Sequence, residues 1–300
     1  MRSGSDRPPA QGLRLSDGRR LAWYEYGDPG GRPCVYITGT PASGVAGGLY
    51  HAAARQAGVR WISVDKPGYG GSDFQRGRRL LDWPQDVRAL ADHLGLDRFA
   101  VAGESGGGPH ALALAYGLPQ RVTAALVIAG MGPGHEAWVR QGMKPMNRRL
   151  LWLAQHAPGL LRWALRAMAR TLSDAARRER WVQRQLRASP PADRALFQRY
   201  PELMPLTLDA ACEALRPGPE GAAQELQMLA SPWGFDPARI QVPVWLWHGT
   251  EDVNVPVAVA RALAAAIPDC QAHFIAGAGH ALYEHRHEMV QALRTHAIGV

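Results

Sequence analysis

The chain has few cysteines, few lysines and no long apolar run. Its three cysteines, Cys34, Cys212 and Cys270, lie far apart and form no Cys-x-x-Cys pair. This argues against a disulfide framework or a zinc site and indicates a reducing cytoplasm, the compartment we expect. No stretch of 18 apolar residues occurs, so we expect no membrane span. Residues 1–12 lack the apolar core and cleavage pattern of a secretory signal, and we expect a short disordered tail.

The positive charge is almost entirely arginine, because only Lys66 and Lys144 are lysine. The net charge is +8, but an arginine excess can reflect a GC-rich genome, so we do not infer nucleic-acid binding. The distribution is more informative. Residues 140–199 hold 13 Arg and one Lys against three acidic residues, a net charge of +11 that leaves −3 for the rest.

The order of β-rich and helical patterns predicts one α/β core with an insertion. Residues 13–133 alternate between the two patterns, and the alternation returns over 233–300, which indicates a mostly parallel sheet with helices on both faces. Residues 134–232 contain no clear strand and are interrupted by proline, so we expect an all-helical cap of four or five helices. The expected strands are 20–26, 33–38, 59–64, 98–102, 123–129, 242–247 and 272–276, and the expected core helices are 46–57, 82–94, 106–117, 256–267 and 280–296.

A Gly-x-Ser-x-Gly motif at residues 103–107 is the central chemical signal. Alone it is weak, because the chain contains 33 glycines. However, an expected strand enters the motif and an expected helix leaves it, and strand, sharp turn and helix are the geometry that exposes a nucleophilic serine. We therefore predict Ser105 as the nucleophile, the alternative being a glycine-rich turn with an incidental serine.

A nucleophilic serine needs a base, and the base needs an orienting acid. Asp252 and His280 each follow an expected strand, and reacting groups gather where the strands of such sheets end. We predict Asp252 as the acid and His280 as the base. Glu251 remains a rival for the acid and His248 a rival for the base.

The loop after residues 33–38 offers an oxyanion hole. Its backbone N–H groups follow a strand, and a second donor is expected from the residue after the nucleophile. We assign the two donors to Thr40, with Gly39 as the alternative, and to Gly106. Gly39, Glu104 and Trp138 are further candidates for contact with the substrate.

Five segments together resemble the capped α/β-hydrolase superfamily, serine-nucleophile type: ITGTPASG, DKPGYGGSD (65–73), GESGGGPHALALA, HGTEDVNVP and GAGH. The resemblance covers nearly the whole chain beyond the tail. It implies the α/β-hydrolase fold and a Ser-Asp-His order of catalytic residues. Two departures stand out: Thr38-Gly39 replaces the usual His-Gly, and Glu104 precedes the serine where His or Trp is common. We expect Glu104 to support a cap contact or to tune His280.

These features predict hydrolysis of an ester, thioester, lactone or amide through an acyl-enzyme. We expect no metal and no organic cofactor, and a small-molecule substrate with an apolar acyl part. The sequence does not indicate the oligomeric state. In the cap, Arg162, Arg166 and Arg170 recur at i, i+4; they form either a solvated helix face, the more usual outcome, or a site for an anion such as a substrate carboxylate, a phosphopantetheine carrier or a membrane surface.

Three other functions fit the same pattern less well. Epoxide hydrolase or dehalogenase chemistry needs a carboxylate nucleophile, whereas this chain has Ser105. A cofactor-free lyase, transferase or perhydrolase would use the same three residues. A ligand-binding protein that keeps the fold without turnover belongs to a different class, and the intact set of Ser, Asp and His argues against it.

Overall fold

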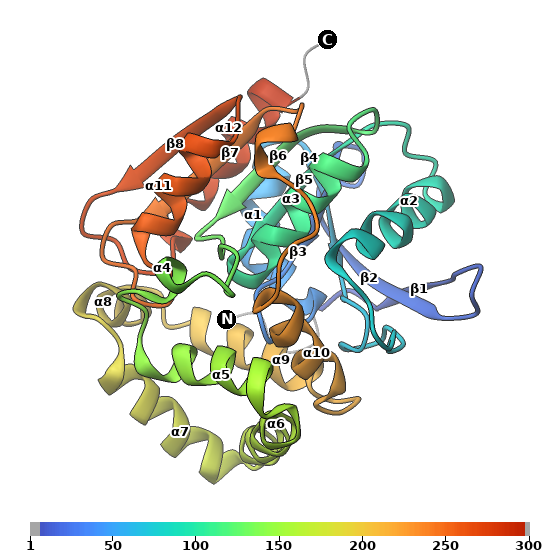
Figure 1. Ribbon diagram of the computed structural model, residues 1–300. Coiled ribbons are helices and arrows are strands. Elements are labelled where there is room, and N and C mark those ends of the chain that lie inside the picture. Colours follow the sequence, from blue (N-terminus) through green and yellow to red (C-terminus); the bar gives the residue numbers. More distant parts are fainter. Residues whose placement is uncertain (1–6, 298–300) are drawn as a thin grey trace.

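Eight strands form one mixed sheet in the computed structural model, which describes residues 7–297 (Figure 1). The spatial order is β1-β2-β4-β3-β5-β6-β7-β8. Neighbouring strands from β4 to β8 run parallel, whereas β2 pairs antiparallel with β4 and β1 antiparallel with β2. The strands are β1 (Gln11–Arg14), β2 (Arg20–Gly27), β3 (Arg32–Ile37), β4 (Val59–Val64), β5 (Phe99–Glu104), β6 (Val122–Ile128), β7 (Val244–Gly249) and β8 (Cys270–Ile275).

Helices cover both faces of this sheet because strand side chains alternate between two apolar layers. In β3, Val35 and Ile37 join the layer of α2, α3 and α11, while Cys34 and Tyr36 join the layer of α1 and α12. The mostly parallel sheet with helices on both faces is therefore confirmed. The core helices are α1 (His51–Gln56), α2 (Trp83–His93), α3 (Gly108–Gly117), α11 (Val257–Ala266) and α12 (Arg286–Ala297).

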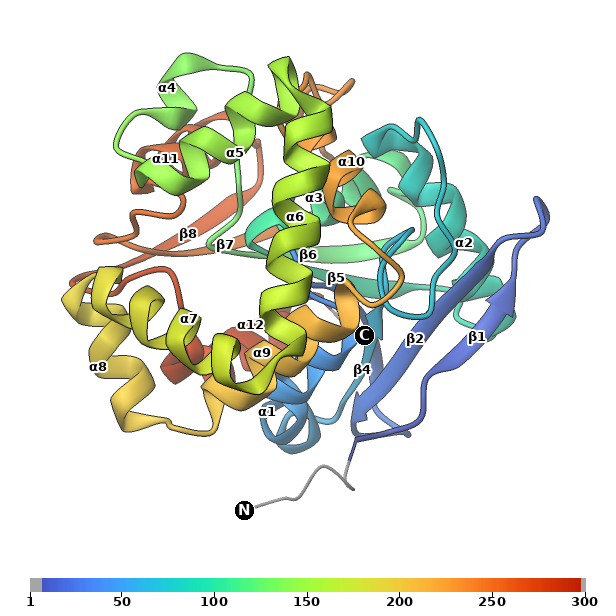
Figure 2. The same cartoon turned by 90° about the horizontal axis from the view of Figure 1, so that it is seen from below.

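Seven helices lie between β6 and β7, more than the four or five predicted. Residues 129–243, all of them described, contain no strand. Proline opens α5, α6 and α8, where its fixed φ and missing N–H suit the first turn and separate one helix from the next. The helices are α4 (Ala137–Arg140), α5 (Pro145–His156), α6 (Pro158–Ser173), α7 (Ala175–Ala188), α8 (Pro191–Arg199), α9 (Leu203–Ala214) and α10 (Glu220–Leu229). Figure 2 shows α6 in front of the sheet when the molecule is seen from below.

Most expected boundaries shift by a few residues; for example, the expected helix 46–57 is a 3-10 turn at Gly44–Tyr50 followed by α1. Two of the differences concern the predicted tail and the loop of His280. Strand β1 begins at Gln11, inside the range predicted as a tail, because its backbone pairs with β2; residues 1–6 of that range lie outside the described residues. The expected helix 280–296 starts later, with a 3-10 turn at Tyr283–His285 before α12. Residues 280–282 therefore stay in a loop after β8. In the described chain, no helix is long and apolar enough to cross a membrane.

Candidate active site

Ser105 stands at the sharp turn between β5 and α3. Its φ is +53°, a left-handed conformation that non-glycine residues rarely adopt and that is found at strained functional turns. The turn is too crowded for a side chain at Gly103, where a Cβ atom would lie 2.3 Å from the carbonyl oxygen of Gly107. The backbone therefore forms the nucleophile elbow that the motif predicts.

The structure brings Ser105, His280 and Asp252 together at the carboxyl edge of the sheet. His280 lies in the loop after β8 and Asp252 in the loop after β7. The Nε2 atom of His280 is 3.1 Å from Ser105 Oγ, and its Nδ1 atom is 2.7 Å from Asp252 Oδ2. With the proton on Nδ1, the imidazole donates to Asp252 and its Nε2 lone pair accepts from the serine hydroxyl.

Electrostatics favour charge separation between His280 and Asp252. Burial lowers the pKa of His280, but the charge of Asp252 and the hydrogen bond to it outweigh burial and raise that pKa above its usual 6.5. Burial raises the pKa of Asp252, but the neighbouring histidines outweigh this and hold it well below the ordinary range. Asp252 is therefore an anion that stabilises a protonated His280.

The two rivals occupy other positions. Glu251 is exposed, whereas Asp252 is buried. His248 is fully buried and contacts the same carboxylate oxygen as His280: its Nε2 atom is 3.3 Å from Asp252 Oδ2 and 2.8 Å from the carbonyl oxygen of Val255. The backbone N–H groups of Asn254 and Val255 donate to Asp252 Oδ1. His248 thus helps to hold the acid and does not reach the serine.

The predicted oxyanion loop lies directly against the elbow. A Cβ atom on Gly106 would meet Thr40 Oγ1 at 2.2 Å, and one on Gly39 would lie 3.3 Å from Ser105 Cβ, so these backbones are adjacent. The N–H of Thr40 donates to no group in the hydrogen bonds of the described loops and turns. Gly106 is in the first turn after Ser105, where amides lack helical partners. The backbone of Gly39 and Thr40 thus lies beside the turn that carries Ser105 and Gly106.

Glu104 faces an aromatic layer rather than the cap. Its Oε2 atom accepts hydrogen bonds from the hydroxyls of Tyr36, at 2.5 Å, and Tyr50, at 3.2 Å. Its negative charge also contributes to the raised pKa of His280. Of the two roles expected for Glu104, the geometry favours tuning His280.

A buried ionic cluster, which no local motif in the sequence indicates, supports the predicted oxyanion loop. Lys66 and Glu225 are both fully buried, and their charged atoms lie 2.7 Å apart. Lys66 Nζ also donates to the carbonyl oxygens of Thr38, at 2.7 Å, and Gly39, at 2.9 Å. Tyr69 donates a short hydrogen bond to Glu225. Lys66 therefore connects Glu225 of helix α10 to the loop that carries Thr40, although Lys66 and Glu225 are 159 positions apart in the sequence.

A second missed residue, Asp193 of α8, lies on the loop of His280. It is 6% exposed, and its Oδ1 accepts a hydrogen bond of 3.3 Å from the N–H of Ala281. A Cβ atom at Gly279 would lie only 2.2 Å from the same oxygen, so the carboxylate of Asp193 packs directly against the backbone of this loop. The charge of Asp193 adds to the raised pKa of His280.

Trp138 is the remaining candidate. It lies on α4, 39% exposed, and its indole makes no hydrogen bond or ring contact in the described part of the chain. Among residues 7–297, no group of three or more His, Cys, Asp or Glu side chains is arranged to hold a metal ion.

Known proteins share this architecture and parts of this sequence. A stretch of 119 residues is 39% identical to the dihydrolipoyllysine-residue acetyltransferase component of the acetoin cleaving system of Pseudomonas putida and covers 39% of this chain and 32% of that protein. A stretch of 138 residues is 27% identical to the proline iminopeptidase of Neisseria gonorrhoeae and covers 43% of each chain. The chain thus matches less than half the length of these curated relatives.

The fold itself has close counterparts among solved structures. A thermophilic esterase from Thermogutta terrifontis superposes with a TM-score of 0.66 and 21% sequence identity, covering 95% of this chain and 97% of the other. The model of the alpha/beta hydrolase family matches residues 33–292. That match spans the core strands from β3 onward, the cap helices and all the site residues described above. The chain belongs to the alpha/beta hydrolase family.

Proposed function

We propose that this protein is a serine hydrolase that cleaves an ester, thioester, lactone or amide by way of an acyl-enzyme. The observation that carries the proposal is the continuous hydrogen-bond path from Asp252 through His280 to Ser105, with distances of 2.7 and 3.1 Å. A serine hydroxyl is a weak nucleophile until a neighbouring base accepts its proton.

In the first half of the reaction, Ser105 Oγ attacks the substrate carbonyl carbon while its proton passes to His280 Nε2. The imidazolium so formed is stabilised by Asp252, which lies 2.7 Å from Nδ1. His280 then gives its proton to the leaving oxygen, sulfur or nitrogen as the acyl bond breaks. In the second half, water gives a proton to His280 and attacks the acyl carbon. His280 then returns that proton to Ser105 Oγ as the acyl–oxygen bond breaks, which releases the acid and restores the serine hydroxyl and the neutral imidazole.

Negative charge builds up on the carbonyl oxygen in both halves. The N–H groups of Thr40 and Gly106 are the proposed donors, since both lie beside Ser105 and neither amide is taken up by another loop contact. Fixed donors of this kind stabilise the transition state without reorganising.

An apolar acyl group fits the surroundings of the site. Leu229, on α10, places a methyl carbon 3.3 Å from the position of a Cβ on Gly106. An apolar side chain from the cap therefore borders the nucleophile and the oxyanion donors. An apolar side chain beside a few polar groups is the combination that binds the apolar part of a substrate and orients its reacting part.

Transfer of the acyl group to an acceptor other than water is the second candidate. It is favoured by the similarity to a protein named as an acetyltransferase component, over 39% of this chain. The two functions share the acyl-enzyme and differ only in the group that attacks it. A primary alcohol or thiol added to the assay yields a new ester or thioester in the second case, and only acid in the first.

The test is hydrolysis of p-nitrophenyl esters with short and long acyl chains, alongside an aryl thioester, a lactone and proline p-nitroanilide. We expect turnover of at least one ester and its loss in Ser105→Ala. Ser231→Ala, whose hydroxyl caps a carbonyl in α10, is the matched control and should keep full activity. Activity that survives in Ser105→Ala would contradict the proposal, as would binding of these compounds without any turnover.

A further inference from the structure

The cap carries large apolar side chains on its solvent side. Trp152 is 56% exposed, Leu160 61% and Trp163 68%. Met146 is also exposed. The sequence favours burial of apolar residues in this region, and Leu161 and Leu165 do pack inside. The four exposed side chains therefore differ from the rest. Exposure of large apolar side chains to water is unfavourable, and clusters of them are typical of interaction surfaces in soluble proteins.

These apolar side chains share their helix faces with arginines. On α6, Trp163, Arg166 and Arg170 follow one another at i, i+3 and i+7, so they form one stripe. On α5, Arg149 and Trp152 are related in the same way, at i and i+3. On the underside of the molecule, α6 packs against α5 and against α7 (Figure 2). We call the solvent side of these three helices, residues 145–188, the cap face.

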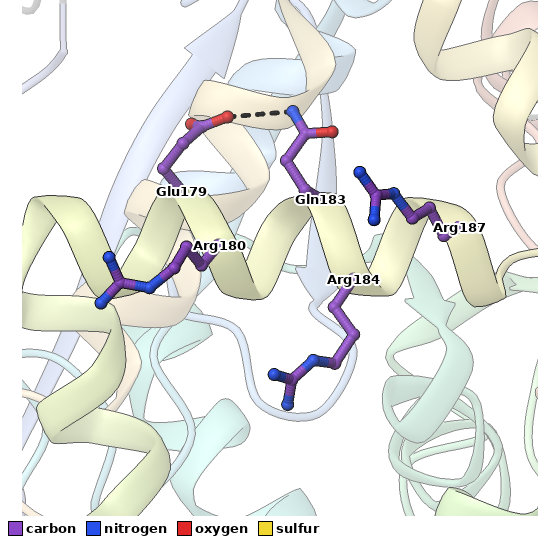
Figure 3. A pocket seen from close by; sticks show the side chains of 5 residues that line it. All are labelled: Glu179, Arg180, Gln183, Arg184 and Arg187. Carbon is purple, nitrogen blue, oxygen red and sulfur yellow. Dashed lines mark hydrogen bonds between the residues drawn. The ribbon is translucent and has the colours of Figure 1, made fainter.

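The third helix adds cationic groups without partners. Arg180, Arg184 and Arg187 project from α7 and, with Glu179 and Gln183, line a surface hollow of about 390 Å³ (Figure 3). Glu179 accepts a hydrogen bond from Gln183 and from none of the arginines. In the described chain, none of these three guanidinium groups forms an ion pair.

The region around the cap face is strongly positive as a whole. Residues 140–199 carry a net charge of +11. Arg162 and Arg170 are exposed and form no ion pair within residues 7–297, whereas Arg166 contacts Glu220 at 3.3 Å. Of the two interpretations of this arginine stripe, a solvated face or an anion site, the unpaired cations beside exposed indoles favour the anion site.

We propose that the cap face docks onto an anionic lipid surface. Indole rings prefer the boundary between headgroups and acyl chains, aliphatic side chains add buried area, and arginines pair with lipid phosphates. The exposed Leu160 and Met146 favour a lipid surface over a nucleic acid as the partner. Aliphatic side chains gain burial in a lipid surface, but they gain nothing from the charged backbone of a nucleic acid. The attachment is peripheral: residues enter the headgroup layer from one side.

Vesicle binding by the full-length protein tests this proposal. The probes are vesicles of pure phosphatidylcholine and vesicles with about 30% phosphatidylglycerol, compared by flotation at low and high salt. We expect at least tenfold tighter binding to the anionic vesicles, and we expect high salt to weaken it because the Debye length shortens. Equal binding to both kinds of vesicle, or binding to neither, would overturn the proposal.

Matched variants separate the cap face from overall charge. Arg180→Gln/Arg184→Gln/Arg187→Gln is expected to weaken binding to anionic vesicles at least fivefold. The control is Arg55→Gln/Arg88→Gln/Arg98→Gln, which removes three exposed arginines from the α/β part of the chain. We expect it to change vesicle binding less than twofold. Equal loss in both triple variants would mean that only net charge matters, and the proposal would fail.

Two further variants test the apolar part and the independence from catalysis. Trp152→Ser/Trp163→Ser is expected to reduce vesicle binding at least fivefold with unchanged unfolding, since both side chains are exposed. Ser105→Ala should bind vesicles as the wild type does, so loss of the proposed catalysis leaves this result unaffected. Binding to a single-stranded oligonucleotide that depends on the same tryptophans, with no vesicle binding, would assign the face to nucleic acid and overturn the proposal.

Discussion

Replacing Glu225 with glutamine is expected to lower the unfolding free energy by about 3–5 kcal/mol, the cost of breaking a buried ion pair. Glu225 and Lys66 are fully buried, and Arg78, also buried, lies within the same cluster. Glu225→Gln preserves the shape of the side chain but removes the carboxylate that lies 2.7 Å from buried Lys66 and that also interacts with the charge of Arg78. The variant also loses the charge that strengthens the hydrogen bond from Tyr69.

A double variant distinguishes the effect of the ion pair on stability from its effect on the oxyanion loop. Lys66→Met/Glu225→Met removes one cation and one anion together, so at least half of the lost stability should return. Its kcat should nevertheless fall about tenfold, or ~1.4 kcal/mol of transition-state free energy. The reason is that Thr38 and Gly39 lose the donor that fixes their carbonyls.

Urea unfolding followed by tryptophan fluorescence, with ester hydrolysis on the same samples, measures both effects. The control is Glu220→Gln on the same helix, because Glu220 is exposed and its contact with Arg166 should be worth less than about 1 kcal/mol. A Glu225→Gln variant within 1 kcal/mol of the wild type would refute the reasoning. So would a Lys66→Met/Glu225→Met variant that recovers less than half of the stability lost in Glu225→Gln.

Three further changes probe the site itself. Asp252→Asn should lower kcat by about 10³–10⁴-fold in ester hydrolysis, because the amide no longer stabilises a protonated His280; a loss below tenfold would speak against its role. The acid limb of the pH profile of kcat/KM should lie above pH 6.5, because neutral His280 is the base and its pKa is raised; Asp193→Asn removes a negative charge and should move that limb down by roughly 0.5 unit, and no shift would contradict the electrostatic account. Gly39→Ala places a Cβ 3.3 Å from Ser105 Cβ and should cut kcat/KM about tenfold with little change in thermal unfolding, whereas unchanged kinetics would show that the loop has room to move.

Much of the core and of the site was predictable because its signals are local. Each parallel strand is a short apolar run, and the strained turn at Ser105 needs glycines that are visible in five residues. Asp252 and His280 follow strands, so topology alone brings them to one edge of the sheet. The match of the family model to residues 33–292 confirms the predicted family and fold.

The remaining features depend on contacts between distant segments. Asp193 reaches the loop of Ala281 across 88 positions, and Glu225 reaches Tyr69 across 156, so no motif could pair them. Strand β1 has no alternating pattern and exists because β2 offers a free edge. The outward orientation of Trp163 depends on which face of α6 packs against its neighbours. These features arise from tertiary packing and leave no local signature.

The role of Ser105 is tested most directly by mass spectrometry after reaction with a fluorophosphonate probe. The proposed mechanism predicts one covalent adduct per chain, located by peptide mapping on Ser105, and formed more slowly below the pKa of His280. Ser105→Ala should form no adduct under the same conditions. An unlabelled wild type, or an adduct that persists in Ser105→Ala, would contradict the central claim.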